Sequence, residues 1–435
     1  MRSDADMVLR NKKYILKIYD EPLMELNVKI DDFGRFTVSV DCVDESKRQQ
    51  FPLLLLEPTA ENARLWLQGR TIPKNRKFVD RILETAGLAF NDKIGILDIC
   101  KGLSVNDAYW LDDGTVNVSF ADINLYDNQL DETLALVAYT GYSSSQKHKI
   151  GLSTEWTTDG QFAKAWRRIE DNLYLFKAGS EGFANAGMEP YSEYFAAQVA
   201  EQMEIPHVPY DLKRWKGKLA SVCPLLNNKD TAFVPFWVAS NQSIFPGPLA
   251  ATLMFSEETF QQMRSMFVFD ALICNQDRHA SNYGMLRDNH TGRVLGMAPL
   301  FDHNLSLFAR DMEVDYPHFL KRADTVFGPA GSQLSFIEEA KIVMGENQHE
   351  QLRKMIGFQF KNHPDYPMSD NRLEALNKYI AGRTKELMNI PVVNDIELRR
   401  SMENEYRHFK DRVPMIAVSE KGHMIENKKR KIKSR

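Results

Sequence analysis

The spacing of apolar residues changes along the chain, and this change constrains the fold more than any single motif. Apolar residues alternate in strand fashion in Lys12–Cys42 and again in Phe162–Ala178. From Ser256, a plausible helix N-cap, they recur every third or fourth position, as in helices. One face of the helix predicted there carries Phe260, Met263, Phe267 and Ala271. A mixed β region followed by a mainly helical region predicts a two-lobed α+β enzyme with a cleft between its lobes.

The same patterns divide the 435 residues into four parts. Helical spacing at Thr59–Gln68 and Lys77–Ala86 follows the first strand region. In the second strand region, one helix is predicted at Pro190–Met203, and the strand pattern returns near Lys218–Cys223. We therefore predict an N-terminal module with a small antiparallel sheet plus helices (1–130), a β-rich lobe (131–228), a helical lobe (229–392), and a C-terminal helix with a basic tail (393–435).

Composition narrows the class of protein. The chain is 43% hydrophobic and 26% charged, as in ordinary soluble globular proteins. Its longest strongly apolar run, Phe51–Leu56, is far shorter than the roughly 20 residues that cross a bilayer. The cysteines form no CxxC pair, which argues against a zinc knuckle or a disulfide framework; they are Cys42, Cys100, Cys223 and Cys274. We expect a cytoplasmic protein without a membrane span.

Charge is distributed unevenly. Lys428–Arg435 holds six basic residues and no acid, so the formal net charge of −4 leaves −10 for the rest of the chain. Such a run is usually a solvated end, although it can also dock on nucleic acid or an acidic partner. We expect contact with nucleic acid only through this tail or indirectly.

The stretch ICNQDRHASNYG, which follows the predicted helix, places Asp277 and Asn282 five positions apart. Protein kinases use this spacing in their catalytic loop, where the Asp orients the attacking hydroxyl and the Asn oxygen holds magnesium. The pair alone is weak evidence, because a polar loop often contains both residue types. Asp302 adds to it, because it interrupts an apolar, strand-like run at Met297–Phe308 and a kinase has a second magnesium-binding Asp downstream.

Upstream residues could serve the same chemistry. Lys177 is in phase with Leu173 and Leu175 on a predicted strand, although a lysine at a strand end often only extends to water. Glu193 lies on the small apolar face of the next helix, where alanines follow at i+3, i+4 and i+7. A buried glutamate needs a partner, and Lys177 is the candidate.

A phosphate-binding loop is less clearly marked. WTTDGQFAKAW has a turn at Asp159-Gly160 between strand-like flanks, which suits either a backbone nest for phosphate oxygens or a plain hairpin turn. The GxGxxG pattern is absent.

With these parts in place, residues 150 to 390 resemble the HipA-like serine/threonine kinases, the toxin kinases of bacterial toxin–antitoxin systems. The motifs that carry the resemblance are NQDRHASN, LFDHN, YLFK and SEYFAAQVAE. The resemblance implies a two-lobed protein-kinase-like fold that uses ATP and Mg²⁺. It implies that Asp277 is catalytic, that Asn282 and Asp302 bind the metal, that Lys177 binds the α and β phosphates, and that Glu193 anchors Lys177.

The resemblance also suggests nucleotide-binding and regulatory positions. Gly160 and Gln161 would form the phosphate loop, and a hinge near the adenine would include Ser221, Val222, Cys223 and Leu225. Family members can autophosphorylate a serine in the phosphate loop. This chain has no serine in WTTDGQ, so Thr157 or Thr158 would take that role.

Two departures keep other functions open. The DRH order around Arg278 is shared with phosphoinositide kinases, and Asp302 is followed by His303 and Asn304 in place of Phe-Gly. We expect His279 and His303 to order their loops, without transferring protons. The favoured function is a kinase that phosphorylates Ser/Thr of a protein substrate, with a translation component as candidate substrate and an antitoxin as candidate partner. The alternatives are a phosphoinositide or small-molecule kinase and a nucleotide-binding pseudokinase.

Overall fold

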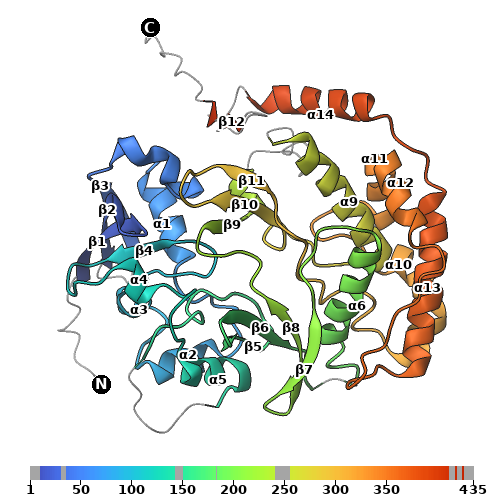
Figure 1. Cartoon of the computed structure of the whole chain (residues 1–435), viewed down its shortest axis with the longest axis horizontal. Helices are drawn as coiled ribbons and strands as arrows, with labels where there is room; N and C mark the ends of the chain where they lie inside the picture. The colour runs from blue at the N-terminus through green and yellow to red at the C-terminus, as the bar shows by residue number, and fades with distance from the viewer. Residues whose placement is uncertain are drawn as a thin grey trace. The chain divides into compact units, whose positions relative to one another are not determined.

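The computed structural model describes residues 10–30, 36–142, 150–182, 184–240, 255–410, 417–418 and 424–425 (Figure 1). The basic segment Lys428–Arg435 lies outside these residues. The described residues contain helices and antiparallel sheets, so the predicted α+β class is confirmed. Within the described part of the chain, no helix has both the length and the apolarity that a membrane span requires.

The chain forms two compact units. The first comprises Met1–Gly179, Lys213–Ala232 and Asp288–Gly292, and the second comprises Ser180–Leu212, Phe233–Arg287 and Arg293–Arg435. The first unit is rich in strands and the second is mainly helical. The four-part division expected from the sequence stays a prediction.

A four-stranded antiparallel sheet opens the first unit, in the order β3-β2-β1-β4. Its strands are β1 (Arg10–Ile18), β2 (Glu21–Ile30), β3 (Phe36–Asp41) and β4 (Tyr109–Asp112). Tyr14, Leu16 and Ile18 are buried at alternate positions of β1, as the sequence pattern predicts. The predicted small antiparallel sheet is confirmed, and β4, which the sequence did not reveal, extends it along β1 with Leu111 opposite Leu16.

Short helices complete this part of the first unit. Thr59 caps α1, because its side chain accepts a hydrogen bond from Asn62 N at 3.2 Å. The helices are η1 (Glu45–Gln50), η2 (Leu53–Leu55), α1 (Ala60–Gln68), α2 (Val79–Thr85), α3 (Lys93–Cys100), α4 (Phe120–Ile123) and α5 (Glu132–Thr140).

The second sheet of the first unit has the order β5-β6-β8-β7. Its strands are β5 (Lys164–Ile169), β6 (Asn172–Ala178), β7 (Asp211–Trp215) and β8 (Lys218–Pro224). A turn at Glu170-Asp171 joins β5 to β6, which pair antiparallel. Ala165, Phe176 and Val222 are buried in a core that α5 helps to form through Ala135 and Tyr139.

Helix α9 (Glu257–Ile273) is the centre of the second unit. Ser256 caps it as predicted, accepting a hydrogen bond from Thr259 N at 3.2 Å. The helix packs against α6, α11, α12 and α13 (Figure 1). The remaining helices of this unit are α6 (Glu189–Gln202), α7 (Phe236–Ala239), η4 (Glu313–His318), α10 (Phe319–Thr325), α11 (Phe336–Val343), α12 (Glu346–Arg353), α13 (Asp370–Met388) and α14 (Asp395–Lys410).

A third sheet has the order β11-β10-β9, with β9 before α9 in the chain and β10 and β11 after it. Its strands are β9 (Thr231–Pro235), β10 (Gly284–Asp288) and β11 (Val294–Met297). A separate two-stranded sheet is formed by β12 (Ala417–Val418) and β13 (Met424–Ile425). The expectation that Met297–Phe308 is strand-like is wrong beyond Met297. Asp302, Leu307 and Phe308 adopt left-handed φ angles of 56°, 49° and 57°, which are incompatible with an extended strand.

Candidate active site

The loop after α9 is closed by its own side chains. Cys274 ends the helix in a left-handed conformation (φ 53°), and its N–H donates to Asp270 O. Asp277 N donates to Asn275 Oδ1 at 3.2 Å, and Asn282 Nδ2 donates to Asp277 O at 2.8 Å. The Asp277 side chain is 36% exposed, whereas Asn282 is buried. The loop thus presents a carboxylate to its surroundings and fixes the amide of Asn282, with Oδ1 as the acceptor end.

The contacts of His279 fit a role in ordering this loop. Its backbone N donates to Asp277 O at 2.8 Å, and its Nδ1 accepts a hydrogen bond from Ser281 N at 3.3 Å. The ring is half exposed, and Nε2 lies 4.0 Å from Asp277 Oδ1.

Asp302 is held by its backbone in a conformation that is uncommon for residues other than glycine. Its N–H donates to the Tyr210 hydroxyl at 3.1 Å, and the next N–H, of His303, donates to Glu193 Oε2 at 2.8 Å. The buried His303 ring packs edge-on against Phe269, with centroids 5.3 Å apart. Unusual backbone of this kind persists where the surroundings enforce it, and it clusters at functional sites.

Backbone hydrogen bonds join the two loops. Gln276 N donates to Leu305 O at 3.2 Å, and Leu307 N donates to Ile273 O at 2.8 Å. The loop of Asp277 and Asn282 is therefore tied to the segment that follows Asp302, within one compact unit.

The oxygen donors of these loops suit magnesium. Mg²⁺ favours oxygen ligands and is usually bound by one or two protein groups together with water and substrate phosphates. Asn282 Oδ1 and the Asp302 carboxylate are such groups. Among the described residues, no cluster of three or more His, Cys, Asp or Glu side chains could hold a metal.

In the first unit, Lys177 on β6 lies directly opposite Lys164 on β5, and both side chains are buried. Residues at directly opposite positions of an antiparallel pair lie on the same face of the sheet, so the two lysine side chains share one face. The sequence interpretation missed Lys164. The turn at Glu170-Asp171 was the available signal, because it fixes the register that pairs residue 164 with residue 177.

The loop before β5 contains the turn at Asp159-Gly160, for which the sequence allowed either a phosphate-binding nest or a plain hairpin turn. It is not a plain hairpin turn. The backbone N–H groups of Thr157 and Thr158 both donate to Thr154 O at 3.2 Å, so the N-terminal flank is a turn and not a strand. Gly160 has φ +109°, and a Cβ atom there would collide with Nζ of Lys164. The loop therefore brings its glycine against Lys164, while Gln161 is exposed beside it.

A buried ion pair anchors this loop to β5. Arg76 pairs with Glu155, and the same Arg76 Nη2 donates to Lys164 O at 2.7 Å. Glu155 Oε1 accepts from Trp166 N at 3.1 Å. Burial raises the pKa of Glu155, against the opposing effects of Arg76 and of the Trp166 N–H. These bonds fix both the loop and the start of the strand that carries Lys164.

The predicted hinge lies at the end of β8. Ser221, Val222 and Cys223 belong to this strand and pair with β6. Leu225 N donates to Leu173 O at 3.0 Å, and Pro224 has no N–H. Neither residue therefore offers a backbone donor to an adenine in this arrangement, and the hinge stays a prediction.

Asp277, Asn282, Asp302 and Glu193 thus belong to the second unit, and Gly160, Lys177 and Ser221 belong to the first. The pairing of Lys177 with Glu193 joins residues of different units and stays a prediction.

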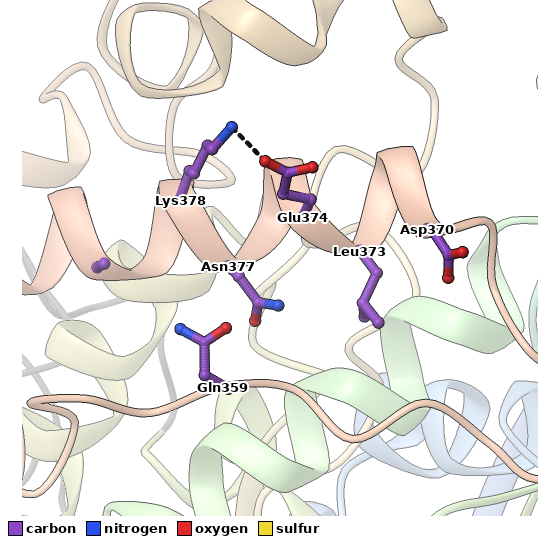
Figure 2. Close-up of a pocket in the computed structure, with 7 residues that line it drawn as sticks. Gln359, Asp370, Leu373, Glu374, Asn377 and Lys378 are labelled. Atoms are coloured by element: carbon purple, nitrogen blue, oxygen red, sulfur yellow. Dashed lines mark ion pairs between the residues drawn. The ribbon is translucent and has the colours of Figure 1, made fainter.

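A separate hollow of about 500 Å³ lies along α13 in the second unit (Figure 2). Lys378 and Glu374 form an ion pair of 2.6 Å at its edge, and Asn377 Oδ1 accepts from Phe360 N at 2.9 Å. Its lining comprises Gln359, Asp370, Leu373, Glu374, Asn377, Lys378 and Ala381. None of the predicted site residues is among them.

No protein family model and no curated protein sequence matches the chain. Two of the solved structures that match its fold do so over most of their own length. The proinflammatory kinase CtkA of Helicobacter pylori has a TM-score of 0.44 and 18% identity, over 57% of this chain and 93% of that one. HipA of Shewanella oneidensis MR-1, solved with HipB and operator DNA, has a TM-score of 0.49 and 12% identity, over 87% of this chain and 100% of that one. Since both TM-scores are below 0.5, function is inferred from the site itself.

Proposed function

We propose that this protein is an ATP- and Mg²⁺-dependent phosphotransferase of HipA type that phosphorylates Ser or Thr of a protein substrate. The observation that carries the proposal is the joining of two loops by backbone hydrogen bonds. One presents Asp277 and Asn282, and the other begins at Asp302, whose backbone is left-handed. Phosphoryl transfer needs such an arrangement, because its catalysis is mostly positioning and charge neutralisation.

Each residue has a proposed role. Asp277 orients the attacking hydroxyl and accepts its proton, and Asn282 and Asp302 hold the metal, which neutralises charge on the phosphates when bound. Lys177 and the neighbouring Lys164 bind phosphate oxygens, and Glu193 pairs with Lys177. Glu193 Oε2 also accepts from His303 N, so the same side chain would connect the lysine with the Asp302 segment.

Transfer of the labelled γ-phosphate of ATP tests the proposal. The purified protein is incubated with Mg²⁺ and either a host protein extract or phosphoinositide vesicles. Label on Ser or Thr of protein supports the proposal, and label on lipid supports the phosphoinositide kinase. Nucleotide binding with no transfer or hydrolysis would favour the pseudokinase. The acidic net charge of the chain disfavours attraction to anionic membranes.

A toxin role and an antitoxin partner form the second part of the proposal, and they come from the HipA-like motifs. We expect growth arrest when the wild type is expressed and none when Asp277→Asn is expressed. A translation component is the candidate substrate, and phosphoproteomics of the arrested cells would identify it. Phosphotransfer in vitro without any growth arrest would support the kinase activity and contradict the toxin role.

Replacement of Gly160 by Ala is expected to raise the KM for ATP about tenfold. The backbone at φ +109° disfavours alanine, at about 1–3 kcal/mol, and the added methyl would displace Lys164 Nζ. Gly217→Ala is the matched control, because Gly217 also has a positive φ (+80°) but has nothing within 4 Å of an added Cβ. Steady-state kinetics on both variants measures the effect. Equal changes in KM for the two would remove Gly160 from the nucleotide site.

Autophosphorylation at Thr157 or Thr158 is expected to add the mass of one phosphoryl group after incubation with ATP. The Thr158 hydroxyl donates to Thr154 O at 2.8 Å and the Thr157 hydroxyl to Leu103 O at 3.3 Å, so the loop must open before either reacts. Intact-mass spectrometry of the wild type and of the Thr157→Ala/Thr158→Ala double variant tests this. An unchanged mass gain in the double variant would place the phosphate elsewhere.

A further inference from the structure

Arg278, the second residue of the DRH sequence, is buried and uses all five of its N–H donors. Nε and one Nη2 hydrogen bond go to the Asp270 carboxylate, at 2.9 and 3.0 Å. Nη1 donates to two carbonyls, Asn282 O at 2.8 Å and Phe301 O at 2.6 Å. The second Nη2 hydrogen bond goes to His303 Nδ1 at 2.9 Å.

These acceptors lie on three different parts of the second unit. Asp270 belongs to α9, Asn282 ends the loop that contains Asp277, and the Phe301 and His303 acceptors stand on either side of Asp302 in the chain. A single planar group therefore sets the spacing between the two residues proposed to hold magnesium. Since an arginine has no acceptor, the contact also requires His303 Nδ1 to be the acceptor nitrogen of its ring.

Charge reinforces this geometry. Burial lowers the pKa of Arg278, but the attraction of Asp270, and to a lesser degree of Asp302, raises it, and the net direction is upward. The ion pair that the structure gives this guanidinium is with Asp270, at 2.9 Å.

We infer that Arg278 is a positioning residue for the metal, which fixes Asn282 and Asp302 relative to each other and so sets the affinity of the site for Mg²⁺. The inference rests on the proposed function. It assigns to Arg278 a task in the reaction, whereas the sequence alone marks this residue only as a feature shared with phosphoinositide kinases.

Lysine cannot replace Arg278 in this role. Its ammonium has three donors on a flexible stem, so it can neutralise Asp270 but cannot reach both carbonyls and His303 in one plane. Mutation of a group that hydrogen-bonds to metal ligands and orients them typically lowers the affinity for the metal by about 10- to 100-fold. Arg278→Lys should therefore fold while binding the metal poorly.

The test measures thermal stabilisation by a non-hydrolysable ATP analogue as Mg²⁺ is titrated, together with kcat as a function of Mg²⁺. For Arg278→Lys we expect the half-saturating Mg²⁺ concentration to rise about tenfold or more in both measurements. Stabilisation by the analogue without Mg²⁺ should stay unchanged. Asp270→Asn, which keeps the shape of the Arg278 partner and removes its charge, should shift the titration in the same direction and serves if Arg278→Lys does not fold.

Arg264→Lys is the matched control. Arg264 is also fully buried in the second unit and also pairs with an aspartate, Asp395, at 2.6 Å, but its remaining bonds go to Val343 O and Gln261. Its Mg²⁺ titration should equal that of the wild type. The inference is overturned if Arg278→Lys has the same Mg²⁺ titration as the wild type, or if both lysine variants shift it equally. Neither result contradicts the proposed kinase function. A wild type that shows no Mg²⁺-dependent stabilisation overturns the proposed function as well.

Discussion

Asp277→Asn is expected to lower kcat about 100- to 10,000-fold, the range that a positioned general base contributes. Asparagine keeps the size of the side chain but cannot accept the proton of the attacking hydroxyl. Because the Asp277 backbone makes the bonds that close the loop, and its side chain is 36% exposed, the substitution should leave the loop intact. The measurement is single-turnover phosphotransfer together with thermal melting.

The melting temperature separates a chemical effect from a structural one. Binding of the ATP analogue and its Mg²⁺ dependence should match the wild type, because Asn282 and Asp302 are unchanged. Asp365→Asn, an exposed aspartate in a loop of the same unit, serves as the control and should retain full activity. Activity within tenfold of wild type for Asp277→Asn would contradict the catalytic assignment.

Asp302→Asn is expected to abolish turnover, with a loss of about 1000-fold or more. A bound metal contributes several kcal/mol of transition-state charge stabilisation, and each 1.36 kcal/mol is tenfold in rate. Asparagine tests the carboxylate more cleanly than alanine, because Asn tolerates the left-handed backbone that Asp302 adopts at φ 56°. The hydrogen bonds of Asp302 N to Tyr210 and of His303 N to Glu193 are then retained.

The decisive measurement is the metal titration of nucleotide binding. Asp302→Asn should lose Mg²⁺-dependent stabilisation, which Asp277→Asn should keep. This difference separates a metal ligand from a catalytic base. If both variants lost the Mg²⁺ dependence equally, the division of roles between the two loops would be wrong.

The sequence predicted those parts of the fold that repeat a local pattern. Alternation located β1, β2, β5 and β6, and helical spacing with the Ser256 cap located α9. It did not reveal β4, because Tyr109–Asp112 is short and becomes a strand only by pairing with the distant β1. It also misjudged Met297–Phe308, since left-handed positions leave no trace in a run of apolar letters.

For the candidate site, too, the sequence revealed local spacing but not long-range contacts. The spacing of Asp277, Asn282 and Asp302 was visible in the sequence, and the structure ties their loops together. Lys164 and the buried contacts of Arg278 became evident only from strand register and side-chain direction. Which residues share a site is decided by long-range packing, and a single sequence does not encode that in its local pattern.

The arrangement at the end of β8 bears on the choice between purine nucleotides. If a purine base binds at the predicted hinge, its edge finds no main-chain donor at Leu225, whose N–H is bonded to Leu173 O, or at Pro224, which has no N–H. Adenine and guanine differ mainly in the donors and acceptors along that edge. Discrimination between ATP and GTP by these two residues would then depend on their carbonyl oxygens and side chains.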